Sequence, residues 1–161
     1  MKHLTLVLLF ICFNLSAQEN PQSELFKTLK QKDSLIFEVG FNNCDASVYP
    51  TLVADDLEFY HDQGGITNSR EALVQTFKKN ICGNPNFKSR RELVENSLEV
   101  FPMYSNGNLY GALQTGVHKF YESFNGKPEV AGSTARFAHL WLLENGAWTL
   151  KRVISYDHIS P

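Results

Sequence analysis

The sequence predicts one α+β domain in which helices come first and an antiparallel sheet comes last. Helical spacing of apolar residues is confined to the first half of the chain, whereas strand-like alternation dominates from residue 92 onward. Three Asn-Gly pairs separate the later apolar runs, and each pair signals a tight turn between antiparallel strands. Because strands and helices do not alternate along the chain, the order disfavours a doubly wound parallel sheet.

Residues 1–17 have the pattern of a secretory signal peptide. A charged start, Met1-Lys2-His3, precedes an apolar run over residues 4–13, and small or polar residues lead to Ala17. The apolar run is about half of the roughly 20 residues that cross a bilayer. We expect cleavage after Ala17 and a periplasmic or secreted protein with no membrane anchor.

Length and charge limit the possibilities for the mature chain. A polar linker over residues 18–22 leads into residues 23–161, which suffice for a single domain with one core. The formal net charge of −2 gives no basic face that would displace counterions from nucleic acid. We therefore expect no nucleic-acid partner, and no motif calls for a cofactor.

The first half of the domain predicts three helices and one strand. Apolar residues at helical spacing predict the first helix over residues 23–41. Asp45 can cap a shorter second helix, which Pro50 breaks before residue 52. Residues 57–61 alternate like a strand, and a turn at residues 62–65 leads to a third helix. Asn68 with Glu71 is typical of a capping box at the start of that helix, and Gly83 ends it.

The second half predicts four strands, joined in part by the Asn-Gly turns. The expected ranges are residues 92–101, 109–121, 132–143 and 147–158. Consecutive tight turns predict an antiparallel meander.

Two cysteines, Cys44 and Cys82, remain after the signal peptide is removed. An even count in an exported chain favours a disulfide, and two separate buried thiols are the alternative.

Together these elements resemble the nuclear-transport-factor-2-like superfamily, which includes ketosteroid isomerases, scytalone dehydratase and SnoaL-like polyketide cyclases. The resemblance covers nearly all of the mature chain and is strongest to small exported bacterial domains. Four segments carry the resemblance: the opening helix, residues 52–59, the Gly64-Gly65 turn before a capped helix, and residues 141–155.

The resemblance implies a strongly bent sheet that wraps the helices as a cone, with a pocket at the open end, and a homodimer. It does not imply one reaction, because the fold serves enzymes, binders and dimerisation modules. The aspartate, tyrosine and protonated carboxyl group of ketosteroid isomerases have no clear counterparts in this sequence.

Strand alternation predicts which side chains face the pocket. If residues 144–147 form a tight hairpin, His139 lies opposite Arg152, and Tyr156 and His158 share their face. His61 and His118 share faces with apolar residues of their own strands. Four histidines on one face predict a polar pocket rather than a dry core, because buried polar groups need partners or water.

Three kinds of pocket follow. The first binds a small anionic or carbonyl-bearing molecule, and the second is an enzyme of isomerase, dehydratase or cyclase type. The third is a metal site, the minority interpretation, because no close histidine spacing supports it.

The binding site would use Tyr60, His118, His139, Arg152, Tyr156 and His158. The enzyme would use His61 or His118 as base, oriented by Asp62 or Asp157. The metal would be held by His61, His118, His139 or His158, with Asp62.

A fourth possibility is an interaction module that dimerises through the outer face of the sheet. Such a module tolerates a pocket filled by large side chains, which distinguishes it from the other three.

Two further motifs in the sequence do not indicate a function. Arg90-Arg91 reads as a solvated pair before a strand. Ser155 and His158 lie on one strand close to Asp157, and alternation of faces predicts that they cannot form a hydrolytic triad.

Overall fold

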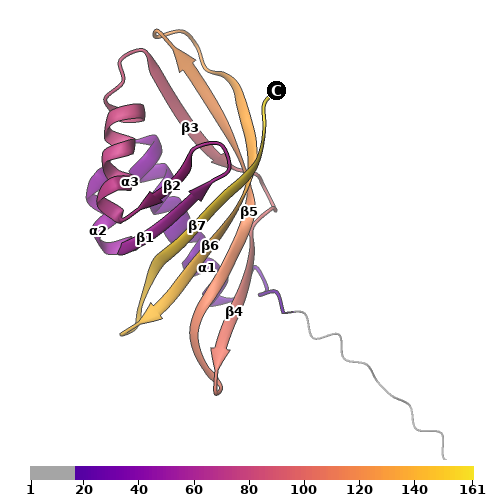
Figure 1. The fold of residues 1–161 in the computed structure, drawn as a ribbon. Helices are drawn as coiled ribbons and strands as arrows, with labels where there is room; N and C mark the ends of the chain where they lie inside the picture. The colour runs from indigo at the N-terminus through magenta and orange to yellow at the C-terminus, as the bar shows by residue number, and fades with distance from the viewer. Residues whose placement is uncertain (1–16) are drawn as a thin grey trace, which may run out of the picture.

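A computed structural model of the protein describes residues 17–161 (Figure 1). The predicted signal peptide therefore lies outside the described residues, apart from Ala17. Within the described part, no helix combines the length and apolarity needed to cross a membrane.

The helical elements occupy the first half of the domain, as predicted. They are α1 (Glu24–Ser34), its π-helical continuation η1 (Leu35–Asn42), the 3₁₀ turn η2 (Ala46–Val48), α2 (Tyr49–Leu52), α3 (Arg70–Phe77) and its π-helical continuation η3 (Lys78–Cys82). The strands are β1 (Val53–His61), β2 (Gly65–Asn68), β3 (Phe87–Leu93), β4 (Glu99–Ser105), β5 (Asn108–Phe124), β6 (Val130–Glu144) and β7 (Ala147–Ile159).

Side-chain caps explain where the helices begin. Ser23 accepts a hydrogen bond from the backbone N–H of Phe26, and Asp45 caps η2 in the same manner. The predicted cap at Asn68 is wrong, because Asn68 is the last residue of β2 and Ser69 accepts the hydrogen bond instead. Pro50 does not exclude helix at Tyr49, since it lies in the first turn of α2, where its missing N–H has no intrahelical partner.

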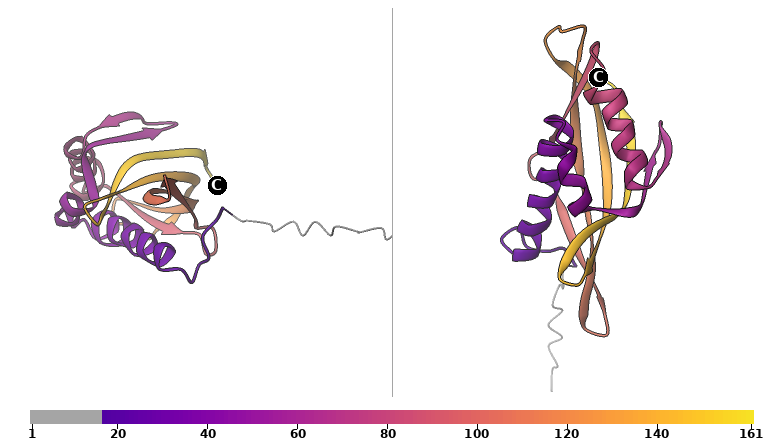
Figure 2. Two further views of the ribbon diagram at one scale, coloured as in Figure 1. Left: turned by 90° about the horizontal axis from the view of Figure 1, so that it is seen from below. Right: turned by 90° about the vertical axis from the view of Figure 1, so that its left-hand side faces the viewer.

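The seven strands form one curved sheet in the order β2-β1-β7-β6-β5-β3, with β4 also paired to β5. The predicted meander is present, because β4, β5, β6 and β7 pair antiparallel in sequence. The sheet as a whole is mixed, however, since β1 runs parallel to β7. The α+β class is confirmed, and Figure 2 shows the sheet curving around the helices.

The predicted strand over residues 92–101 is wrong, because it is two strands. The long strand β5 pairs with β3 along one half and with β4 along the other. The chain must turn between these partners, and Asn96 at φ 59° marks that turn. Asparagine tolerates positive φ better than most residues. The three Asn-Gly pairs do form the predicted turns, with both residues of each pair at positive φ.

Two bulges in β7 change the predicted register. Trp141 lies opposite Leu150, as expected, but Leu140 then lies opposite Arg152, so Lys151 is an extra residue. A second irregularity follows between Arg136 and Thr134, where β7 again has an additional residue. Each extra residue reverses the faces of the residues that follow it.

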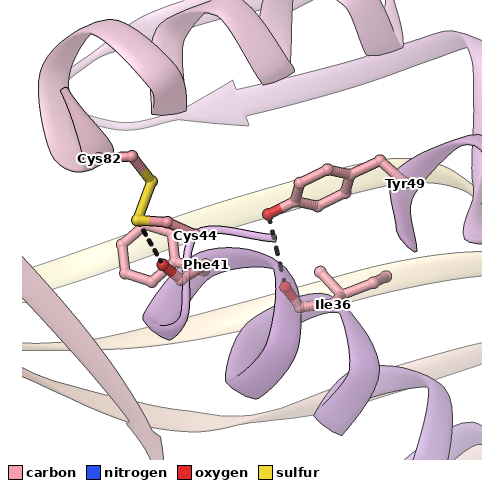
Figure 3. Close-up of a disulfide and its surroundings, with 5 residues drawn as sticks. All are labelled: Ile36, Phe41, Cys44, Tyr49 and Cys82. Carbon is pink, nitrogen blue, oxygen red and sulfur yellow. Dashed lines mark hydrogen bonds between the residues drawn. A yellow bond between two sulfur atoms is a disulfide. The ribbon is translucent and has the colours of Figure 1, made fainter. Parts of the chain in front are cut away.

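The core lies between the concave face of the sheet and the helices (Figures 1 and 2). Trp141 and Phe137 of β6 are fully buried there, together with Leu29 of α1 and Tyr49 of α2. The backbone of η1 comes close to α2, since the Tyr49 hydroxyl donates to the carbonyl oxygen of Ile36 at 3.5 Å (Figure 3).

A disulfide joins Cys44, after η1, to Cys82, at the end of η3 (Figure 3). Its Cα atoms are 5.7 Å apart, and the two residues are separated by 38 positions. The bridge therefore ties α3 and η3 to the first helical segment.

Replacing both cysteines by serine should destabilise the domain, because the bridge limits the unfolded chain. A loop of this length corresponds to about 3–4 kcal/mol, and for a domain of this size to a fall in Tm of about 10 °C. Thermal unfolding followed by circular dichroism measures the change. The wild-type protein in dithiothreitol is the control and should show a similar loss. Equal Tm values for all three samples would contradict the prediction.

Candidate functional site

A cavity of about 380 Å³ lies between the concave face of the sheet and the helical elements. Most of its wall is apolar and comes from both layers. Representative residues are Phe37, Phe41, Phe77, Phe120, Phe137 and Val153. A polar group on the same wall consists of His61, His118, Ser155 and His158. The cavity is therefore mainly hydrophobic with this polar group on its wall, and a few other polar side chains, among them Asn80 and Glu122, also line it. Such a combination is common in small-molecule sites.

Ser155 of β7 lies between two histidines. Its Oγ is 3.5 Å from Nε2 of His118, on β5, and 3.3 Å from Nε2 of His158, on its own strand. The serine is buried to 5% exposure, so the imidazoles are its direct neighbours. The hydroxyl can donate to one ring and accept from the other.

Asp62 fixes the proton on His158. Its Oδ1 is 2.5 Å from His158 Nδ1, and its Oδ2 accepts the backbone N–H of the same residue at 3.2 Å. Since an ionised carboxylate only accepts, Nδ1 carries the hydrogen and Nε2 of His158 is left as an acceptor. The Ser155 hydroxyl therefore donates to His158.

Arg91 fixes the opposite tautomer of His118, with the hydrogen on Nε2 and not on Nδ1. Its Nε–H donates to His118 Nδ1 at 3.4 Å, so Nε2 of this ring carries the hydrogen and faces Ser155. One directed sequence of hydrogen bonds results. It runs from Arg91 through His118, Ser155 and His158 to Asp62.

Arg91 is itself held by a buried ion pair with Asp33 of α1. The two guanidinium nitrogens lie 2.7 and 3.2 Å from the two carboxylate oxygens, and the guanidinium lies 4.0 Å from the centre of the Phe37 ring. Burial raises the pKa of Asp33, and the neighbouring Arg91 charge opposes this change. The pair supplies the charge compensation that a buried arginine needs.

His61, the last residue of β1, completes the polar group. Its Nδ1 accepts the backbone N–H groups of Gln63 at 3.1 Å and Gly64 at 3.0 Å, which leaves the hydrogen on Nε2. Its ring stacks on that of His158, with centroids 4.2 Å apart. The end of β1 thus supplies the histidine, and the first residue of the following turn supplies the carboxylate of Asp62.

Burial keeps the rings of His118 and His61 neutral. Desolvation, with the Arg91 charge and the other histidines adding to it, lowers the pKa of His118 to about 3. Desolvation and His158 also lower the pKa of His61, although Asp62 opposes this. At neutral pH both rings are therefore uncharged and present N–H groups.

His139 of β6 forms a second buried group beside the first. Its Nδ1 is 3.3 Å from Oε1 of Gln114, which also accepts the Trp141 indole N–H at 2.8 Å. Within the described residues, Nε2 of His139 and Nε2 of Gln114 have no hydrogen-bond partner. Desolvation, followed by the Arg91 charge, lowers the pKa of His139 well below its usual value.

The structure separates the residues expected in the pocket into two sets. His61, His118, His139 and His158 line the cavity, and Asp62 contacts His158. Tyr60, Arg152 and Tyr156 do not line it, so their expected orientation is wrong. The bulge at Lys151 turns Arg152 and Tyr156 to the outer face, where Arg152 pairs with Glu58 at 2.8 Å. Tyr60 donates to the same glutamate.

Asp157, the other expected orienting group, also lies outside. It pairs with Arg136 at 3.3 Å on the outer surface.

Sequence reasoning missed four residues of the site and its support: Asp33, Arg91, Gln114 and Ser155. The sequence pattern predicts that Arg90 and Arg91 are both solvated. This is wrong for Arg91, which is 3% exposed, whereas Arg90 does lie on the surface, paired with Glu129. Two signals were available. Asp33 falls at helical spacing on the apolar face of α1, and Gln114 lies on the His118 side of β5 by alternation. No sequence pattern identifies Ser155 as a pocket residue, because the face of the sheet on which it lies depends on a bulge in β7.

The residues that could hold a metal are His61, Asp62 and His158, whose ligand atoms lie within 4.8 Å of one another. His118 and His139, the other two histidines considered as ligands, are not part of this cluster. His61 already accepts two backbone N–H groups through Nδ1, so binding through that atom would sacrifice both hydrogen bonds.

Stability should fall as the pH drops from about 6.5, because His118 and His139 have lowered pKa values in the folded protein. The unfolded chain binds protons at these rings first, so their contribution is complete above pH 6.5 and is lost as the pH falls, for His118 down to about pH 3. Each ring contributes about 1.4 kcal/mol per pH unit in this window. Urea unfolding at several pH values measures the slope, and His118→Gln should make it shallower. An unchanged slope would contradict the assignment.

Comparisons with known proteins were made by sequence and by structure. No family model matches the chain, and no curated protein matches it either. Solved structures do match. A nuclear transport factor 2-like superfamily protein from Salmonella enterica has a TM-score of 0.64 at 13% identity, covering 81% of this chain and 88% of that one.

Two further structures agree. ActVI-ORFA from Streptomyces coelicolor has a TM-score of 0.65 at 14% identity, over 84% of this chain and 98% of that chain. A putative calcium/calmodulin-dependent protein kinase II association domain from Xanthomonas campestris has a TM-score of 0.63 at 14% identity, over 89% and 96%. At these identities the likeness concerns architecture alone. The chain has the cone-shaped α+β fold of the nuclear-transport-factor-2-like proteins, as its sequence predicts.

Proposed function

We propose that the mature chain is an exported domain that binds a small, mainly apolar molecule inside the cone. The observation that carries this proposal is the cavity of about 380 Å³, which has mainly apolar, largely aromatic walls and a group of histidines with a serine on one of them. Several imidazoles and a buried serine hydroxyl are costly in a dry core unless they have partners, and a ligand can supply part of that partnership.

The charges around the cavity favour a neutral ligand over an anion. Arg152, the expected charge partner, pairs with Glu58 outside the cavity, and Arg91 is neutralised by Asp33. Among the described residues that line the cavity there is no lysine or arginine. The neutral rings of His61 and His118 instead offer N–H donors, which suit a carbonyl or hydroxyl oxygen.

An enzyme that moves a proton, of isomerase, dehydratase or cyclase type, is the second candidate. The observation that favours it is the hydrogen bond between Asp62 and His158 Nδ1, which leaves the other ring nitrogen as an acceptor inside the cavity. His118 is a poor base, because desolvation lowers its pKa to about 3. His61 would then be a hydrogen-bond donor rather than the base.

The interaction module is less well supported, because the interior of the cone is open rather than filled. Dimerisation remains compatible with either function. The Xanthomonas protein is a putative association domain, which supports proposing a homodimer for this chain. The outer face of β7 also presents apolar side chains such as Ile154 and Tyr156.

Filling the cavity should weaken the binding of a suitable probe. The probe is prodan, a neutral aromatic ketone whose emission shifts to the blue in apolar surroundings. Val153→Phe places a larger side chain in the cavity and should weaken binding at least about tenfold, or about 1.4 kcal/mol. The matched control is Ile154→Phe, the next residue on the same strand, which is 46% exposed on the outer face. Equal binding by both variants, or no binding by wild type, would contradict the proposal.

Proton transfer can be tested separately by exchange of α-hydrogens in D₂O. If the chain is an enzyme of the isomerase type, it should catalyse exchange in a bound aromatic methyl ketone such as acetonaphthone, measured by NMR. His158→Gln should reduce the rate by about 100-fold, within the range for general bases, whereas Ser155→Ala should retain most of it. A rate that is the same with and without protein would remove this candidate.

A further inference from the structure

We propose that Ser155, His158 and Asp62 form a serine-histidine-aspartate acyl-transfer site, and that the protein hydrolyses small, mainly apolar carboxylic esters. The proposal rests on the proposed function in one respect, since the ester must occupy the cavity. Sequence reasoning excluded such a triad because Ser155 and His158 share one strand, and the structure removes that objection.

The bulge at Asp157 brings the serine and the histidine together. Residues three apart on a regular strand face opposite sides. Asp157 has φ 59°, and it and His158 together oppose the single residue Ala135. The extra residue returns His158 to the concave side, where its Nε2 is 3.3 Å from Ser155 Oγ. The bulge is thus the feature that creates the pair.

The carboxylate comes from the neighbouring parallel strand. β1 ends at His61, which lies opposite Ser155, and Asp62 follows directly. Asp62 holds His158 by two contacts, from Nδ1 at 2.5 Å and from the backbone N–H at 3.2 Å. The carboxylate therefore orients the ring and places its free nitrogen towards the serine. This order of nucleophile, base and orienting group is the geometry that activates a serine.

A donor for the developing negative charge is also present. His118 directs Nε2–H at Ser155 Oγ from 3.5 Å, and Arg91 holds this tautomer by donating to Nδ1. A neutral ring with its hydrogen fixed beside the nucleophile can donate to the carbonyl oxygen when that oxygen becomes an oxyanion.

The reaction balances with water as the second substrate. Ser155 Oγ attacks the ester carbonyl carbon while its proton passes to Nε2 of His158, and Asp62 stays ionised. The carbon–oxygen bond to the leaving group then breaks, and His158 returns the proton to give an alcohol and an acyl-serine. Water attacks the acyl-serine, again losing a proton to His158. The bond to Ser155 Oγ breaks, the serine recovers its proton, and a carboxylic acid leaves.

The test uses the mature chain with 4-nitrophenyl butyrate, which releases a coloured product, and with a fluorophosphonate, which labels activated serines. Wild type should hydrolyse the ester and gain one phosphonyl group by intact mass, mapped to Ser155. Ser155→Ala and His158→Gln should each lose at least about 100-fold in kcat/KM, and Ser155→Ala should lose the label. The matched control is Tyr156→Phe, which alters the outer face beside Ser155 and should retain both.

Prodan binding by each variant separates the possible results. Binding by wild type and Ser155→Ala, with hydrolysis and labelling only in wild type, supports the triad. Binding without hydrolysis or labelling in wild type overturns the triad and leaves the binding proposal standing. Hydrolysis that survives in Ser155→Ala also overturns it, because another group would then be reacting. Absence of prodan binding in wild type counts against the binding proposal itself.

Discussion

The two bulges of β7 are the constraint on which the site depends. Without the extra residue at Lys151, Arg152 would face the interior, and Val153 and Ser155 would face outwards. Without the second bulge, His158 would not lie on the same side as Ser155. Bulges are common where a strand must re-aim a side chain. Here they convert a strand of alternating polarity into one that presents a hydroxyl and an imidazole to the same cavity.

The ion pair between Asp33 and Arg91 connects this polar group to the helices. It crosses from α1 to β3, and both side chains are 2% exposed. Removing one partner of such a pair costs about 3–5 kcal/mol, because the other charge remains buried. The same arginine fixes the tautomer of His118. One interaction therefore holds the helix against the sheet and sets the direction of the hydrogen bonds at Ser155.

The sequence predicts what depends on local chemistry. Ser23 begins the first helix, the Asn-Gly pairs form turns, and alternation places His61 and His118 inside the cone. It fails where tertiary structure overrides local pattern. Nothing near Lys151 marks a bulge. Simple alternation therefore puts Arg152 on the concave face and Ser155, three residues further on, on the outer face, and both predictions are wrong. Arg91 resembled a surface residue, because its partner lies 58 positions away on a helix.

These failures concern the residues that decide chemistry. Solved structures at 10–16% identity share the cone with this chain, so the cone itself specifies no reaction. Binding requires only the apolar walls and the neutral hydrogen-bond donors. Proton transfer also requires that Asp62 hold the His158 ring with its other nitrogen free to accept a proton. Acyl transfer adds one more requirement, a hydroxyl at hydrogen-bond distance from the free nitrogen of that ring. Because the position of Ser155 relative to His158 follows from the bulge at Asp157, the backbone of one strand determines whether the geometry that acyl transfer requires is present.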